Sequence, residues 1–390
     1  MMLSRPQRSE LPPWLLPVLD RLLALCDEER LHHALLLTGA TGVGKRLLAS
    51  ALVRGLLCRA DPGERPCGHC RDCRLSVAGS HPDIRELTPN PLGLTASGAS
   101  ESSKTRSKKK QTGEQRRGES SETHAQGAKG LSGGSTAGAN EHGEIVIDGV
   151  RELVDFLHLS AQRGGHRAAL IVPCDRLNRA AANGLLKVLE EPPGGTFLVL
   201  ATDRPARLPA TIRSRCASYT VPRPEAAAAQ EWLAARYPKT SRERLQRALI
   251  LAAGTPLRAE AVIEQRQLER FEELLRQLER LSAGGDPVKE AEAWQEEPRL
   301  LVDLLLQVIV EVLRYRQTGQ GSDGDLDLLP ASLVTRLAQQ ITPERGHQLS
   351  ERLLLHRRHL EQPLQGRLSA EAIWLDWLSA VKKETPCRSH

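Results

Sequence analysis

Aromatic residues are scarce in this chain of 390 residues, because Phe, Trp and Tyr together make up only 3% of it. This scarcity argues against a set of aromatic platforms on which nucleic-acid bases would stack. The chain also lacks an apolar run long enough to cross a bilayer, so we do not expect a membrane protein. Residues 1–10 are polar and carry no signal-peptide pattern, and we therefore expect a cytoplasmic protein.

The number of cysteines and the net charge restrict the possible classes of protein further. Eight cysteines in a chain without an export signal predict reduced thiols or metal ligands rather than disulfides. The net charge of +6 is weak evidence for nucleic-acid binding, because the abundance of Arg follows a general bias in composition. The length is sufficient for two or three domains, each with a sizeable core.

One stretch near the middle of the chain has the pattern of a strand, a helix and a second strand. Ala168–Val172 and Phe197–Ala201 are short apolar runs of the kind found in buried parallel strands. Between them, an apolar stripe at helical spacing runs from Leu177 to Leu189, and Pro192 ends the helix. This order predicts one βαβ unit of an α/β fold.

A second strand-to-helix junction, near the start of the chain, contains a glycine-rich loop. Leu35–Thr38 is a short buried strand, residues 39–46 read GATGVGKR, and a helix follows to about Leu57. Such a loop lets backbone N–H groups converge on phosphates, while its lysine reaches the outer phosphates. The candidate phosphate-binding residues are Gly39, Gly42, Gly44 and Lys45. The pattern then requires Ser or Thr to hold magnesium, and this chain has Arg46 there.

Two further motifs resemble the clamp-loader branch of the AAA+ ATPases. Residues 183–193 match its N-x-L-L-K-x-L-E-E-P-P helix, and Ser214-Arg215-Cys216 matches its Ser-Arg-Cys triplet. The resemblance implies that Arg215 is an arginine finger, which stabilises charge on the γ-phosphate bound by a neighbouring subunit. It also implies that Arg215 follows a strand and points outward. The alternative is an ordinary surface arginine in a loop that caps a helix.

The chain departs from the family at the residues that catalyse hydrolysis. Counting back from Asn183, the family's Asp-Glu pair falls on Val172 and Pro173. We assign the nearby Asp175 to a helix N-terminus, where a carboxylate is favourable. Without the hydroxyl and the acids, magnesium has no protein ligands and no residue orients water. ATP can bind through Lys45, but we expect no hydrolysis.

Four cysteines follow the helix after the loop at spacings typical of a zinc site. Thiolates at such spacings can close a tetrahedron around Zn²⁺ and leave no position open for water, so the site is structural. The alternative is four unrelated buried cysteines. A zinc module at this place is also a property of the clamp-loader subunits that the chain resembles. The predicted ligands are Cys58, Cys67, Cys70 and Cys73.

Residues 93–143 differ in composition from the rest of the chain. They contain no Val, Ile, Met or aromatic residue, and eight Lys or Arg against five Glu. A segment of this kind cannot bury enough apolar surface to offset chain entropy, so we predict a disordered insertion. Its basic run, Lys104–Lys110, could contact DNA phosphates weakly, but a solvated insertion is the simpler interpretation.

The rest of the chain is predicted to be helical, and we expect three domains. Residues 1–222 form a P-loop domain with a parallel sheet and the zinc module at 58–73. Residues 223–263 form a small helical lid, in which Arg258 matches the family's second nucleotide sensor. Residues 264–390 form an all-helical collar, through which subunits of this family assemble into a ring.

The resemblance implies a ring subunit that has no catalysis of its own but belongs to a DNA polymerase holoenzyme. Its expected partners are the motor and clamp-opening subunits of a clamp loader and, through the assembled complex, the sliding clamp and primed DNA. Two alternatives differ in class. An active P-loop ATPase would hydrolyse ATP by itself and lose that activity when Lys45 is changed. A zinc-bearing nucleic-acid-binding module would bind DNA tightly, with a steep dependence on salt.

Overall fold

The computed structural model describes residues 7–89, 143–163, 165–319, 328–360 and 365–381. The chain divides into two compact units, of which the first comprises Met1–Gly39 and Gly44–Val221. The second comprises Ala40–Val43, inside the glycine-rich loop, and Pro222–His390. Apart from residue 143, the predicted insertion lies outside the described residues. In the part of the chain that is described, no helix is long and apolar enough to cross a membrane.

The first unit contains a five-stranded parallel sheet with the strand order β2-β3-β4-β1-β5. Every residue of the three inner strands is buried, as expected for a parallel sheet covered on both faces. The predicted α/β class with a parallel sheet is therefore confirmed. The strands are β1 (Ala34–Thr38), β2 (Ile84–Leu87), β3 (Arg167–Ile171), β4 (Thr196–Ala201) and β5 (Ala217–Thr220).

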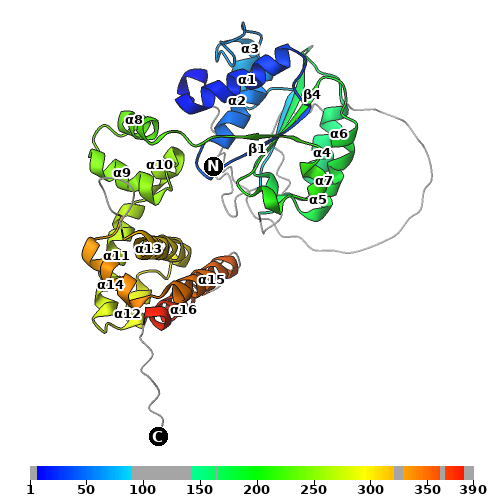
Figure 1. Ribbon diagram of the computed structural model, residues 1–390. Coiled ribbons are helices and arrows are strands. Elements are labelled where there is room, and N and C mark those ends of the chain that lie inside the picture. Colours follow the sequence, from blue (N-terminus) through cyan, green and yellow to red (C-terminus); the bar gives the residue numbers. More distant parts are fainter. Residues whose placement is uncertain (1–6, 90–142, 164, 320–327, 361–364, 382–390) are drawn as a thin grey trace, which may run out of the picture. The chain divides into compact units, whose positions relative to one another are not determined.

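Helices cover both faces of this sheet (Figure 1). On one face, α2 packs against β1, β3 and β4, and α1 and α3 pack against α2. On the other face, alternate strand residues such as Leu36, Ile171 and Leu200 share a core with α4, α5 and α6. The helices are α1 (Leu16–Asp27), α2 (Lys45–Leu57), α3 (Arg71–Val77), α4 (Ile147–His158), α5 (Arg179–Gly184), α6 (Leu186–Glu190) and α7 (Ala210–Arg213).

The single helix that we predicted from Leu177 to Leu189 is instead two short helices, α5 and α6. The first begins after Asn178, whose side chain accepts a hydrogen bond from the backbone N–H of Ala181 at 2.8 Å. The helices meet at Gly184, where an added Cβ would lie 2.7 Å from the Cδ1 atom of Ile147 in α4. Glycine allows this close approach but weakens the helix at that point.

The second unit is all helical in its described residues, and the three largest side chains of its core are tryptophans. Trp294, Trp374 and Trp377 are almost fully buried, and the Nε1–H group of Trp294 donates to the Oε1 atom of the buried Gln277 at 2.6 Å. The helices are α8 (Ala226–Arg236), α9 (Arg242–Leu251), α10 (Pro256–Glu264), α11 (Gln267–Ser282), α12 (Pro287–Glu292), α13 (Pro298–Thr318), α14 (Ala331–Gln340), α15 (Pro343–His359) and α16 (Gly366–Val381).

Candidate functional site

The glycine-rich loop lies between β1 and α2, as the sequence predicts, and two of its glycines are required by close contacts. Gly39 has a φ of +139°, and an added Cβ would lie 2.7 Å from the carbonyl oxygen of Val221. Gly42 has a φ of +85°, and its added Cβ would lie 2.7 Å from the Cβ atom of Arg258. The carbonyl oxygen of Gly42 also accepts a hydrogen bond from the N–H group of Leu257 at 3.2 Å. Residues 40–43 thus pack on the first turn of α10 within the second unit.

The lysine of this loop is engaged by other groups of the chain. The Nζ atom of Lys45 donates to the carbonyl oxygen of Gly39 at 2.9 Å and lies 2.5 Å from the Oδ1 atom of Asp203. The side chain of Lys45 is only 5% exposed. The carboxylate of Asp203, which follows β4, is therefore paired with the ammonium group of Lys45, the group that would otherwise contact the phosphates of a nucleotide.

The positions that would hold magnesium carry no ligand for it. Arg46, the second residue of α2, is exposed and lies in the field of the carboxylates of Glu86 and Asp203. Val172 is buried directly after β3. Asp175 lies in a single 3₁₀ turn, and its Oδ1 atom accepts a hydrogen bond from the hydroxyl of Thr202 at 2.6 Å.

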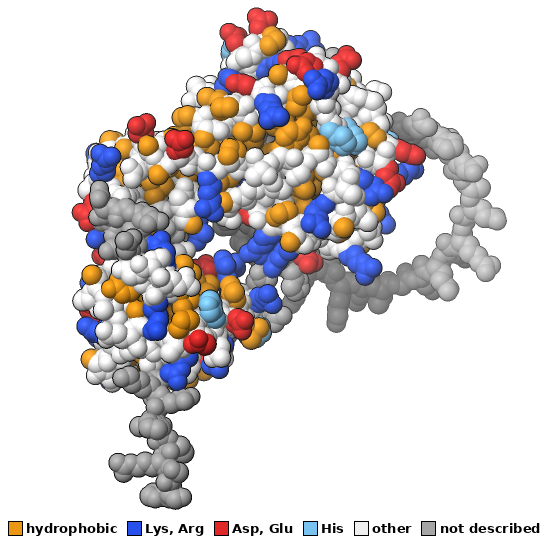
Figure 2. All heavy atoms as spheres, in the orientation of Figure 1, with side chains coloured by type: hydrophobic (Ala, Val, Ile, Leu, Met, Phe, Trp, Pro, Cys, Tyr) orange, Lys and Arg blue, Asp and Glu red, His pale blue; other side chains and the backbone are white. Residues whose placement is uncertain are grey.

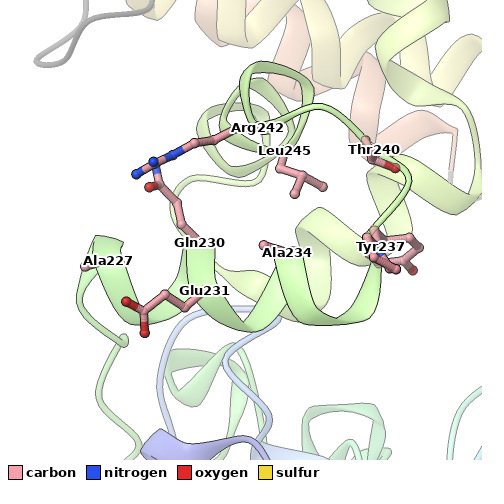
Figure 3. Close-up of a pocket in the computed structure, with 9 residues that line it drawn as sticks. Ala227, Gln230, Glu231, Ala234, Tyr237, Thr240, Arg242 and Leu245 are labelled. Atoms are coloured by element: carbon pink, nitrogen blue, oxygen red, sulfur yellow. The ribbon is translucent and has the colours of Figure 1, made fainter.

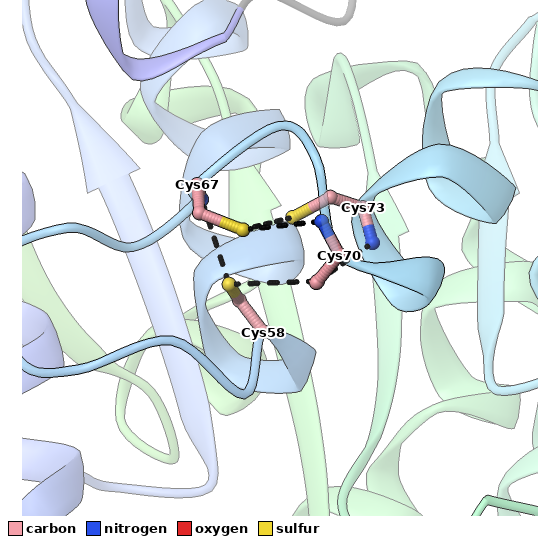
Figure 4. A group of neighbouring side chains, drawn as sticks. All are labelled: Cys58, Cys67, Cys70 and Cys73. Carbon is pink, nitrogen blue, oxygen red and sulfur yellow. Dashed lines mark hydrogen bonds between the residues drawn. The ribbon is translucent and has the colours of Figure 1, made fainter.

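The four predicted cysteines come together in one cluster, with all four Sγ atoms within 4.8 Å of one another (Figure 4). The Sγ–Sγ distance is 3.9 Å between Cys58 and Cys70 and 4.0 Å between Cys67 and Cys73. Four sulfurs bonded at about 2.3 Å to a tetrahedral zinc ion are themselves about 3.8 Å apart. The cluster therefore fits a metal ion such as zinc with little movement of the side chains.

The backbone around the cluster favours thiolates. The Sγ atoms of Cys58, Cys67 and Cys70 each accept a hydrogen bond from a backbone N–H group of the cluster, at 3.4 to 3.5 Å. Hydrogen bonding from the Cys73 thiol, together with backbone N–H groups, lowers the pKa of Cys58 to about 4. The same contact raises the pKa of Cys73, because its proton is shared with the Cys58 thiolate. A cation is needed before all four sulfurs can be deprotonated together.

A buried polar network connects the cysteine cluster with the sheet. Asp72 lies in α3, between Cys70 and Cys73 in the sequence. It accepts hydrogen bonds from Arg163 and from the Nε2 atom of His81, the latter at 3.3 Å. Asp83, just before β2, accepts from the backbone N–H groups of residues 162 and 163 at 2.8 and 3.1 Å and lies 3.6 Å from Arg167. Sequence reasoning missed this network, because its partners are up to 91 residues apart.

The predicted arginine finger, Arg215, comes after the strand β4 in the chain, but α7 intervenes, so that Arg215 lies between α7 and β5. Its Nε and Nη2 atoms lie 2.7 and 2.6 Å from the Oε1 atom of Glu190, the last residue of α6. Its Nη1 atom donates to the carbonyl oxygen of Thr211 at 3.0 Å. The side chain remains 35% exposed, so its guanidinium is both held and accessible.

A pocket of about 380 Å³ lies in the second unit, between α8 and α9 (Figure 3). Its lining combines small or apolar side chains such as Ala234 and Leu245 with the polar Gln230, Glu231 and Arg242. None of the lining residues belongs to the glycine-rich loop, the cysteine cluster or the surroundings of Arg215. The pocket is therefore separate from the three sites that the sequence predicts.

Comparison with known proteins assigns the family. A family model described as "DNA polymerase III, delta subunit" matches residues 17–225, which include the loop, the cysteine cluster and Arg215. The DNA polymerase III subunit delta′ of Pseudomonas aeruginosa is 34% identical over 294 residues, which are 73% of this chain and 73% of that protein. The chain belongs to the DNA polymerase III delta′ family. This confirms the resemblance that the motifs indicate.

Other relatives agree with this family. The delta′ subunit of Escherichia coli strain K12 is 32% identical over 335 residues, which are 85% of this chain and 84% of that protein. The tau subunit of DNA polymerase III from the same strain is 29% identical over 190 residues, but these are 49% of this chain and only 22% of that protein. The match to delta′ subunits is thus closer and covers more of both chains.

Proposed function

We propose that this chain is the delta′ member of a DNA polymerase III clamp loader, a ring subunit that does not hydrolyse ATP. It completes the ATPase site of a neighbouring subunit while the sliding clamp is loaded onto primed DNA. The observation that carries this proposal is a contrast between two sites. Arg46 and Val172 stand where magnesium ligands are needed, whereas Arg215 is held at the surface with its guanidinium accessible.

In this proposal Arg215 acts in trans as an arginine finger. Its planar guanidinium is always charged and can make paired hydrogen bonds to phosphate oxygens. At the γ-phosphate of the neighbour it would stabilise the charge that develops as the phosphoryl group is transferred. Lys45, already paired with Asp203, would make little contribution, so nucleotide binding by this chain itself is not required.

The cysteine cluster is proposed to hold one structural zinc ion. Cys58 directly follows α2, Cys70 caps the start of α3, and Cys73 lies within α3, so the ion would connect one helix to the next. Four sulfur ligands leave no coordination site for water or substrate. The ion would therefore stabilise the module between α2 and β2 and take no part in phosphoryl transfer.

The second unit is proposed to act in assembly, with a lid at residues 223–263 and a collar at residues 264–390. Large exposed hydrophobic side chains support this role, since Val310 of α13, Leu354 and Leu355 of α15, and Leu375 of α16 are 43 to 57% exposed. On the face shown in Figure 2, hydrophobic side chains reach the surface of both units. Exposed apolar side chains of this kind are typical of surfaces that bind other proteins.

The test is a reconstitution with the motor and clamp-opening subunits, with Arg215→Ala compared with Arg213→Ala. Arg213 is exposed and its side chain has no hydrogen-bond or ion-pair partner among the described residues, so it is a matched control. We expect both variants to assemble. Only Arg215→Ala should lower the ATPase activity of the complex in the presence of clamp and primed DNA. Equal behaviour of the two variants, or failure of the unchanged chain to join the complex, would overturn the proposal.

A further inference from the structure

We propose that Glu190 is a positioning residue for Arg215: its carboxylate fixes one edge of the guanidinium so that the remaining N–H groups face an incoming phosphate. This inference rests on the proposed function of Arg215. It goes beyond that function because it assigns a role to a carboxylate on a different helix. Glu190 is the last residue of α6, in the segment that matches the family's helix motif.

The geometry of the pair leaves part of the guanidinium available. Both Nε and Nη2 of Arg215 contact the same oxygen, Oε1 of Glu190, at 2.7 and 2.6 Å. Nη1 donates to the carbonyl oxygen of Thr211 at 3.0 Å and to the hydroxyl of Ser214 at 3.4 Å. A guanidinium has five N–H donors. One N–H of Nη2 therefore has no partner among the described residues, and the long contact with Ser214 can be exchanged for a phosphate oxygen.

Both ends of the pair are attached to the core. Arg215 is flanked by Ile212 and Cys216, which are buried in the same hydrophobic cluster. Glu190 follows the buried Leu189, whose carbonyl oxygen accepts a hydrogen bond at 3.0 Å from the Nε2 atom of His33, just before β1. A carboxylate and a guanidinium on two anchored segments hold each other in one arrangement before any phosphate arrives.

The position of Glu190 is unfavourable for its own helix. Carboxylates destabilise helix C-termini, because the helix dipole places negative charge there. Glu190 lies at such an end, yet its carboxylate forms an ion pair with Arg215, its one cationic partner among the described residues. Its neighbour Glu191 is also exposed but forms no ion pair among the described residues. The pairing with Arg215 thus gives a reason for a carboxylate at residue 190.

The first test measures the contact itself in the isolated chain. An arginine-selective dicarbonyl reagent is applied to the unchanged chain, Glu190→Ala and Glu191→Ala, and modification at Arg215 is measured by peptide mass spectrometry. An exposed ion pair changes an equilibrium by up to about fivefold. We expect Arg215 to react about two to five times faster in Glu190→Ala, and Arg213 to react equally in all three proteins. Unchanged protection of Arg215 would overturn the inference.

The second test uses the assembled complex and separates positioning from other effects. We expect Glu190→Ala to lower the kcat of the clamp- and DNA-stimulated ATPase, with the KM for ATP unchanged, by a smaller factor than Arg215→Ala. Glu190→Gln keeps an acceptor oxygen and should restore part of the loss, whereas Glu191→Ala should have no effect. The double variant of Glu190→Ala and Arg215→Ala should equal Arg215→Ala alone.

The outcomes distinguish the inference from the function on which it rests. If Arg215→Ala leaves the complex unchanged while Glu190→Ala still exposes Arg215 to the reagent, the contact is real and the proposed finger is wrong. If Arg215→Ala lowers activity but Glu190→Ala does not, or the two losses multiply in the double variant, the positioning role is wrong. A faster ATPase in Glu190→Ala would also refute it, because Glu190 would then be holding Arg215 away from phosphate.

Discussion

Removal of the metal from the cysteine cluster should produce a defined pattern of thiol reactivity. We expect the purified protein to contain about one zinc ion per chain. A mercurial reagent that displaces zinc, followed by a colorimetric zinc indicator, would count the ions. The thiols that this treatment frees are those of Cys58, Cys67, Cys70 and Cys73. In the metal-free protein Cys58, whose pKa is lowered, should react first with a disulfide reagent at pH 8, and Cys73, whose pKa is raised by its contact with Cys58, should react after it.

The structure predicts that the other described cysteines react much more slowly. Burial raises the pKa of Cys216 to about 11, so roughly a thousandth of it is thiolate at pH 8. An ordinary thiol with a pKa of about 8.5 is roughly one-quarter thiolate at that pH, so Cys216 should react about two hundredfold more slowly. Burial also raises the pKa of Cys174 and of Cys26. Folded metal-free protein should therefore show a fast phase that begins at Cys58 and does not include Cys216.

Two results would refute this reasoning. One is zinc-free protein that was purified without chelator and has all four cluster thiols reduced. The other is a fast phase that includes Cys216. Hydrogen exchange provides a further check, because loss of zinc should expose α3 and the loop before it while β1, β3 and β4 stay protected. Zinc affinity should fall as pH is lowered, since protons compete with the metal for the thiolates.

Three other predictions concern charged residues. The isolated chain should hydrolyse no ATP above background with or without magnesium, and Lys45→Ala should leave clamp loading nearly intact. A large loss of clamp loading in Lys45→Ala, with assembly of the complex preserved, would show that the nucleotide site is used. Arg215→Lys should not restore the ATPase activity that Arg215→Ala removes from the complex, because an ammonium cannot make the paired contact; recovery in that assay would contradict a finger. Asp83→Ala should lower the free energy of unfolding in urea by about 3 to 5 kcal/mol, because it leaves Arg167 buried without its carboxylate partner. Asp148→Ala, at an exposed position, is the control. A similarly small decrease in the free energy of unfolding in both variants would contradict the estimate.

Much of the fold could be predicted from the sequence because it depends on local patterns. The apolar runs at β1, β3 and β4 mark buried strands whatever their partners are. The spacing of the cysteines predicted their cluster because short loops bring such residues together. The same reasoning placed the glycine-rich loop between β1 and α2, since a strand-to-helix junction of this kind turns N–H groups toward one point.

The parts that sequence reasoning missed depend on contacts between distant segments. The break between α5 and α6 lies beside Gly184, at the point where Ile147 of α4 approaches closely. The pairs of Lys45 with Asp203 and of Arg215 with Glu190 join residues on separate elements. No local pattern could indicate them.

The pair of Lys45 with Asp203 has a consequence for how a ring containing this chain responds to nucleotide. A phosphate that entered the loop would have to displace a carboxylate that belongs to the same chain and is present at any ATP concentration. The charge of Lys45 is thus neutralised by Asp203 at high and at low ATP concentration alike. Such a subunit would keep one conformation through the cycle of its neighbours. Under the proposed function, changes in nucleotide would then be sensed only at the ATPase site of the neighbouring subunit, where we propose that Arg215 acts.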